Sequence, residues 1–173
     1  MGNPYLINAS LDFSFEKVTE ENRDQLNLEF ESLSEVDVDP IGHWLKLKKA
    51  RGETDDSDEV LIELIMELHR KIDRLENVIK GTEKRERVLE NSGFIDSIGF
   101  HHIHSKNPIF IPNQIYYGRV ELKSYPQRDM PIFFKAITNQ IAEIEKIHHR
   151  DESDWGAYFR ARERVMIREN RRL

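Results

Sequence analysis

Histidines are the residues of this chain whose type and spacing come closest to a chemical site. The chain has seven of them. His102 and His104 alternate along a strand-like segment, and His148 and His149 lie near the end of the predicted sheet. Imidazoles two residues apart on one strand face can chelate a metal ion. No carboxylate pattern completes such a set, and histidine is more often a surface or packing residue, so we expect no metal site.

Other catalytic chemistry has little support in the sequence. The chain has no cysteine, which excludes disulfides, thiol nucleophiles and thiolate metal ligands. Its eight glycines form no glycine-rich loop that could hold a phosphate. Charged residues make up 34% of the chain, so close carboxylate pairs arise by chance and usually lie on solvated faces. We therefore expect a protein that is not an enzyme.

Charge is distributed unevenly along the chain, whose net charge is −6. Residues 1–60 hold 15 acidic and 6 basic side chains, whereas the segment Arg160 to Arg172 holds six arginines and two glutamates. The arginines can serve an anionic ligand, nucleic acid or an acidic segment of the same protein, or they can form a solvated helix face. Because the net charge repels nucleic acid, we favour a contact with acidic residues within or between subunits.

The sequence shows no sign of membrane insertion or export. No apolar run approaches the ~18 residues of a membrane span. The start, Met-Gly-Asn-Pro-Tyr-Leu, has neither the pattern of a signal peptide nor that of a myristoylation site. We expect a cytoplasmic protein with one domain of ordinary size or a small domain with an added helical element.

Residues 1–55 are expected to form an acidic N-terminal arm that includes a short basic amphipathic stretch. Before Pro40 the apolar residues show no sustained period, so order there depends on contacts elsewhere. We expect Trp44, in the basic stretch from His43 to Lys49, to pack on the domain rather than on a membrane surface. The arm residues that can dock onto another surface are Phe13, Phe15, Leu26, Leu28, Phe30 and Leu33.

Residues 56–81 have the pattern of a self-associating helix. Asp56 and Glu59 have the spacing of a capping box at its start, and Gly81 marks its end. Between them apolar residues recur at steps of four and three without a polar interruption, which is the pattern of a coiled-coil seam. Its a positions are Ile65, Ile72 and Ile79, and its d positions are Leu61, Leu68 and Leu75.

The same helix leaves the number of chains open. Isoleucine at a with leucine at d favours a parallel dimer. Ile62, Leu64 and Val78 widen the apolar face, which also allows a tetramer, or packing of the helix on its own domain. The seam is only about 28 Å long at ~1.5 Å per residue, so we expect it to need additional contacts for stability.

Residues 82–173 have the pattern of a small antiparallel sheet or barrel followed by a helix. A basic linker leads into strand-like stretches that are separated by proline and asparagine. We expect the last helix to begin at Asp151 as its N-cap. The fold class is thus α+β, with a long central heptad helix and a C-terminal amphipathic helix. The strand-like stretches are Phe94 to His104, Gln114 to Lys123 and Pro131 to Ile147.

This order of elements resembles the PilZ family, a bacterial six-stranded barrel with a terminal helix. The resemblance covers about the C-terminal half of the chain and implies a degenerate PilZ-like barrel. A heptad helix ahead of such a barrel is also similar to an oligomeric subclass of the family, which favours a tetramer. The stretches that carry the resemblance are Phe94 to Phe100, Pro108 to Gly118, Pro131 to Ala136, and Lys146 to Trp155 with the helix up to Arg172.

The resemblance also implies a ligand, because PilZ domains typically bind cyclic di-GMP. In the family an Arg-x-x-x-Arg segment contacts phosphate and guanine through forked guanidinium groups. An Asp/Asn-x-Ser-x-x-Gly segment contacts the other guanine edge. Neither motif is intact in this chain, so we expect no binding through the usual motif. The candidate ligand-binding residues are Lys84, Arg85, Arg87, Asp96, Ser97 and Gly99.

Together these features predict an oligomeric, non-enzymatic PilZ-like adaptor or regulatory protein without a cofactor. The resemblance alone implies a setting in bacterial signalling, such as motility or type IV pili, and a protein partner. The alternative is a cyclic di-GMP receptor with a divergent site. A third hypothesis is nucleic-acid binding through the segment Arg160 to Arg172.

Overall fold

The computed structural model divides the chain into two compact units. One unit combines Met1–Leu33 with Val88–Leu173, and the other is Ser34–Arg87. The second unit is therefore an insertion into the first, and each is described by itself below. The structure describes residues 4–35, 40–81, 87–122 and 128–171.

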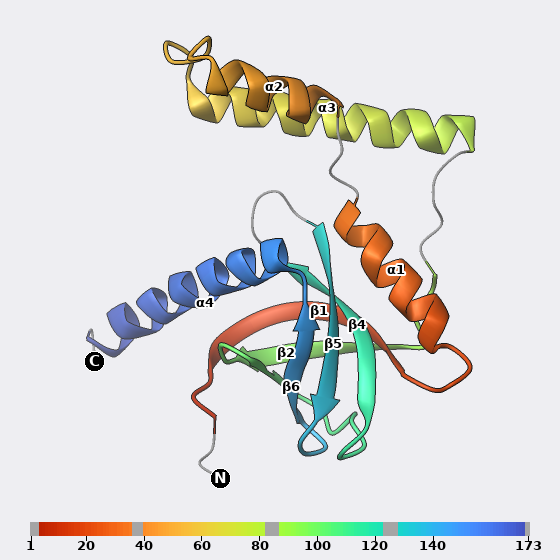
Figure 1. Ribbon diagram of the computed structural model, residues 1–173. Helices are drawn as coiled ribbons and strands as arrows, with labels where there is room; N and C mark the ends of the chain where they lie inside the picture. Colours follow the sequence, from red (N-terminus) through yellow and green to blue (C-terminus); the bar gives the residue numbers. More distant parts are fainter. Residues whose placement is uncertain (1–3, 36–39, 82–86, 123–127, 172–173) are drawn as a thin grey trace. The chain divides into compact units, whose positions relative to one another are not determined.

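The first unit is built on a closed barrel of six antiparallel strands (Figure 1). Around the barrel the strands follow the order β1-β2-β3-β6-β5-β4. The α+β class, the barrel and the helix that follows it confirm that part of the expected fold. The strands are β1 (Ile7–Lys17), β2 (Asn91–Ile98), β3 (His102–Ser105), β4 (Ile115–Leu122), β5 (Arg128–Ala136) and β6 (Ile141–Ile147).

Strand β1 closes the barrel, because it pairs with β2 on one side and with β4 on the other. Its side chains alternate between a buried set, which includes Ile7, Leu11 and Phe15, and an exposed set, which includes Asn8 and Asp12. This period of two is that of a strand with one face on a core. Residues 7–17 are thus part of the barrel rather than of a separate acidic arm.

Aromatic side chains fill the middle of the barrel. The rings of Phe13 and Phe15 stack with centroids 5.0 Å apart, and those of Tyr116 and Phe134 stack at 5.5 Å. Phe110, from the loop between β3 and β4, contacts both pairs. Such rings bury large apolar areas, so this cluster joins β1, β4 and β5 into one core.

Helix α1 (Arg23–Glu35) packs on the outside of the barrel. Leu26 and Phe30 are buried against the outward-facing Tyr117 of β4 and Phe133 of β5. Leu28 was also expected to dock, but it points away from this contact and is 72% exposed. The N-terminal segment therefore contributes a strand to the barrel and a helix to its outer surface.

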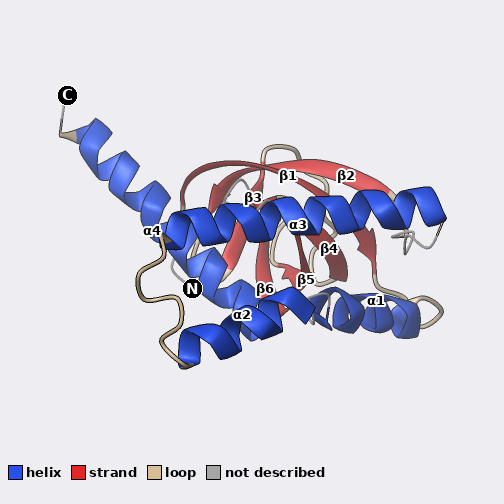
Figure 2. Ribbon diagram, turned by 90° about the horizontal axis from the view of Figure 1, so that it is seen from above, coloured by secondary structure: helices blue, strands red, loops and turns tan. Residues whose placement is uncertain are grey.

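Helix α4 (His149–Asn170) begins against the barrel and then extends away from it (Figures 1 and 2). The buried Trp155 donates its indole N–H to the carbonyl oxygens of Gly99 and Phe100, at 3.3 and 3.0 Å. The N-cap is His148, so the helix starts three residues before the Asp151 cap that the sequence predicts. Asp151 lies buried in its first turn.

The inserted unit contains helices α2 (Pro40–Ala50) and α3 (Glu59–Lys80). Asp58 caps α3, because its carboxylate accepts the backbone N–H groups of Val60 and Leu61 at 2.9 and 3.3 Å. The predicted helix is thus present, with its cap two residues after Asp56. An ion pair of 2.9 Å between Lys49 and Glu59 links the end of α2 to the start of α3.

Candidate self-association surface

Helix α3 exposes the whole of its predicted seam. The exposed fraction of the six seam residues lies between 53% for Ile72 and 85% for Ile79. The structure thus places these residues on one face of one helix, as the spacing predicts. The seam residues are Leu61, Ile65, Leu68, Ile72, Leu75 and Ile79.

Three more apolar residues enlarge this face. Leu64 and Val78, which the sequence places beside the seam, are 52% and 50% exposed, and Val60 in the first turn is 64% exposed. Val60 was not predicted, because it does not lie at a seam position. We call the six seam residues together with these three the α3 stripe.

One flank of α3 is less exposed than the stripe. Ile62 lies near Lys49 of α2, since both line one shallow hollow at the turn between the helices. Along the same side His69 contacts Asp73 at 3.1 Å, one turn further on. Charged side chains elsewhere on α3, such as Arg74, are exposed as well, so the helix leaves at the surface an apolar side that an ordinary surface helix buries.

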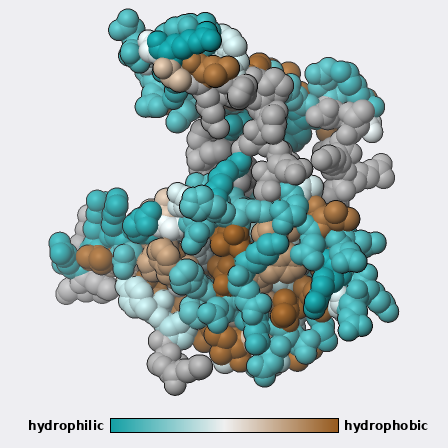
Figure 3. All heavy atoms as spheres, in the orientation of Figure 1, coloured by the Kyte–Doolittle hydropathy of each residue, from teal (hydrophilic) through white to brown (hydrophobic). Residues whose placement is uncertain are grey.

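Helix α2 carries a second apolar row. Ile41, Trp44 and Leu47 recur at steps of three and are exposed, Trp44 by 56%. We expected Trp44 to pack on the domain, whereas the structure leaves it at the surface, where the Lys48 ammonium lies 5.7 Å from the indole centre. On the face shown in Figure 3, hydrophobic groups interrupt the hydrophilic surface of this unit.

The candidate residues for cyclic di-GMP belong to both units of the chain. Arg87 belongs to the inserted unit, and Asp96, Ser97 and Gly99 belong to the barrel unit. Lys84 and Arg85 lie outside the described residues. Among the described candidates, Asp96, Ser97 and Gly99 are neighbours, in and directly after strand β2.

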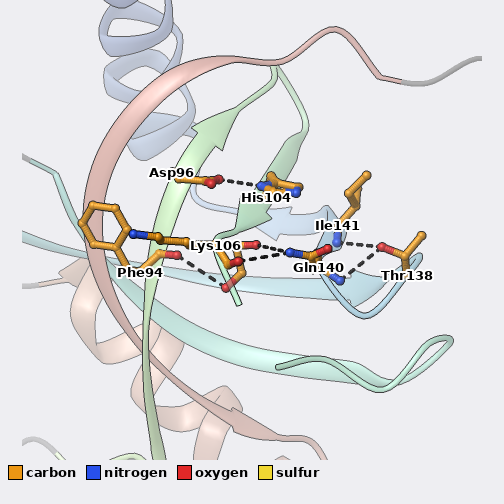
Figure 4. Close-up of polar contacts among 8 residues, drawn as sticks. Phe94, Asp96, His104, Lys106, Thr138, Gln140 and Ile141 are labelled. Carbon is orange, nitrogen blue, oxygen red and sulfur yellow. Dashed lines mark hydrogen bonds and ion pairs between the residues drawn. The ribbon is translucent and has the colours of Figure 1, made fainter. Parts of the chain in front are cut away.

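Asp96 takes part in a contact within the barrel wall. Its carboxylate Oδ1 lies 2.5 Å from His104 Nδ1 on the neighbouring strand β3 (Figure 4). Nearby, the side-chain amide of Gln140 donates to the backbone oxygens of Ser105 and Lys106. These contacts hold β3 between β2 and the β5–β6 turn, which gives both Asp96 and His104 a structural role.

Gly99 is required by close packing. A Cβ atom at this position would lie 3.0 Å from the backbone oxygen of Tyr5. Its N–H donates to the His102 oxygen at 2.7 Å and so closes the turn between β2 and β3. A glycine here is explained by the approach of the N-terminal segment, without reference to a ligand.

The sequence did not predict a buried charged cluster under α1. Arg119 of β4 and Glu29 of α1 are both largely buried. The Nε atom of Arg119 lies 3.5 Å from Oε1 of Glu29. The hydroxyl of Tyr117 donates to the same carboxylate oxygen at 2.9 Å. The acidic N-terminal segment thus meets an arginine of the barrel. Only the alternation of β4 could have predicted that Arg119 faces α1.

The remaining candidates are the arginines of α4 and the possible metal ligands. Within α4, Arg162 donates to the backbone oxygen of Asn8 at 3.1 Å, whereas Arg160, Arg164 and Arg168 are exposed. In the described part of the chain, His, Asp and Glu side chains form no group of three that could hold a metal ion. No helix within the described ranges has both the length and the apolar character needed to cross a membrane.

Comparison of the chain with protein-family models, with curated proteins and with solved structures gives no match. The observed architecture is therefore described by its own topology, a closed six-stranded antiparallel barrel with a helical insertion after α1.

Proposed function

We propose that this protein is a non-enzymatic adaptor that self-associates through the α3 stripe. The observation that carries the proposal is the exposure of an unbroken row of leucine and isoleucine along all of α3. Monomeric soluble proteins scatter their exposed apolar residues, and a long continuous apolar row is typical of an interaction surface. Full burial of one such side chain contributes about 1.5–3 kcal/mol.

Two features favour a second copy of the same chain as the first occupant of the stripe. The residues follow a heptad rule over three heptads, and a heptad seam is best covered by another heptad seam. The row on α2 provides the additional apolar contacts that a seam this short needs. In this proposal the inserted unit sets the assembly, and each copy brings one barrel unit to it.

The barrel unit is the part that we propose to meet a protein partner. Its topology is independent of the inserted unit, so copies joined through α3 would present several barrels together. The closed barrel followed by a helix is also the arrangement that the PilZ resemblance implies. For that reason we keep bacterial signalling, in motility or type IV pilus function, as the proposed setting.

The substitution Ile72→Asp tests this proposal. Because Ile72 is 53% exposed in the single chain, the variant should fold normally. In an assembly the new carboxylate would be buried in the seam at a large cost. We expect the dissociation constant of self-association to rise at least about 100-fold. Sedimentation velocity measures the mass, and circular dichroism checks the fold.

Arg74→Asp is the matched control, since Arg74 is exposed on α3 but lies outside the stripe. Arg74→Asp introduces an aspartate with the same helix propensity as the one at Ile72. Because this aspartate lies outside the stripe, the mass of the assembly should stay unchanged. An Ile72→Asp variant with the sedimentation behaviour of the unsubstituted chain would show that the α3 stripe is not the interface.

A further inference from the structure

We infer that two copies of α3 pair in parallel and in register, with Lys71 of each copy beside Glu76 of the other. This inference rests on the proposed function and adds the direction and alignment of the helices. It starts from the charges at the edges of the α3 stripe. With isoleucine at a and leucine at d, Lys71 occupies a g position and Glu76 the next e position.

In a parallel pair, a g residue lies beside the e residue that comes five positions later on the second helix. Lys71 and Glu76 have this separation and opposite charges, and both are exposed. The two-fold symmetry of a dimer repeats the contact, so two ion pairs flank one seam. The other edge positions within α3 are His69 and the apolar Ile62, Leu64 and Val78, so Lys71 and Glu76 form the acid–base pair at these edges.

An antiparallel pair of full overlap is less favourable. In that arrangement a residues oppose d residues, so Leu61 faces Ile79 and Leu68 faces Ile72 of the second copy. Residues at g then meet residues at g, which places Lys71 beside Lys71. Glu76 meets the apolar Ile62. The antiparallel alignment thus replaces two attractive contacts with one repulsive contact and no ion pair.

Glu76 is available for a contact between chains. In the single chain its carboxylate accepts a hydrogen bond from Lys80, four residues on, and this bond lowers the pKa of Glu76. The carboxylate is therefore ionised at neutral pH. The side chains of Lys80 and Glu76 are 61% and 54% exposed, and exposed pairs of this kind are weak. Lys71 of a second copy can share the carboxylate with Lys80.

Disulfide trapping in the full chain tests the direction of the helices. The chain has no cysteine, so each introduced thiol is unique. In a parallel pair the two copies of Leu61→Cys face one another at a d position within disulfide distance. We expect this variant to oxidise to a covalent dimer, and a mixture of Leu61→Cys with Ile79→Cys to give only the two homodimers. Arg74→Cys, outside the stripe, should remain reduced and reports random collision.

Charge exchange tests the register. Lys71→Glu and Glu76→Lys should each weaken self-association, by about tenfold, because each creates two like-charged contacts in a parallel pair. The double variant should recover the original affinity. Residues five apart do not face each other within one helix, so the recovery reports a contact between chains. A mixture of the two single variants should form the heterodimer in preference to either homodimer.

The outcomes separate this inference from the proposed function. Cross-linking of Leu61→Cys to Ile79→Cys, with no Leu61→Cys homodimer, would show an antiparallel assembly and overturn the inference while the proposed function stands. A failure of the double variant to recover affinity would overturn the register. A single-chain mass for the unsubstituted protein would overturn the proposed function as well.

Discussion

At the scale of single residues, buried charge connects the N-terminal helix to the barrel. Arg119 and Glu29 are removed from water where α1 covers β4, and Tyr117 donates to the same carboxylate. Removing one member of a buried ion pair leaves the other without compensation, which costs more than the pair itself contributes. This cluster should therefore be sensitive to substitution of either partner.

Arg119→Met should reduce the free energy of unfolding by about 3 kcal/mol, the range for breaking a buried ion pair. Methionine keeps the apolar part of the side chain, so the loss reports the charge. Urea denaturation followed by tryptophan fluorescence measures it. Lys135→Met on the exposed face of β5 is the control and should change stability by less than about 0.5 kcal/mol. Equal stability of the two variants would show that the cluster is dispensable.

Residue types alone did not predict the surroundings of Asp96 and Gly99. The family motif makes Asp96 and Gly99 candidates for a ligand site, and in the structure Asp96 contacts His104 while Gly99 lies close to the backbone of Tyr5. Tyr5 is distant from Gly99 in the sequence, and only the closed barrel brings the two together. Local patterns contain no information about such a contact.

At the scale of secondary-structure elements, α3 was predicted well and β1 was missed. The heptad pattern of α3 is local, and its residues lie on one face whatever the rest of the chain does. The alternation of Ile7, Ala9, Leu11, Phe13 and Phe15 was an equally local signal for β1. The acidic and polar residues between them suggested a separate arm. They are instead the exposed face that a half-buried strand requires.

The pairing of β1 predicts how the two units respond to deletion. Replacing residues 37–86 by a flexible glycine-serine linker should leave a folded, strand-rich protein with the mass of one chain. Removing residues 1–17 should abolish cooperative unfolding, because β2 and β4 both lose their partner. Circular dichroism and thermal denaturation of the two proteins distinguish these results. An unfolded linker variant would mean that the barrel depends on the inserted helices.

At the scale of the whole molecule, the insertion separates two tasks. The barrel unit buries most of its apolar residues within itself, in one core inside the barrel and a second under α1. The inserted unit does the opposite and leaves its most apolar residues exposed on α3 and α2. Removing such an exposed row of leucine and isoleucine from water is favourable, so a partner on that side stabilises the helix. The exposed α3 stripe is thus the basis of the proposed assembly.

The mass of the unsubstituted full chain in solution, measured by sedimentation equilibrium over a wide concentration range, tests this account most directly. One chain has a mass of 20.5 kDa. We predict a reversible assembly whose mass is an integral multiple of that value and falls toward it only on strong dilution. A folded protein with the mass of one chain at the highest attainable concentration would contradict the account, because the α3 stripe would then remain exposed to water without a partner.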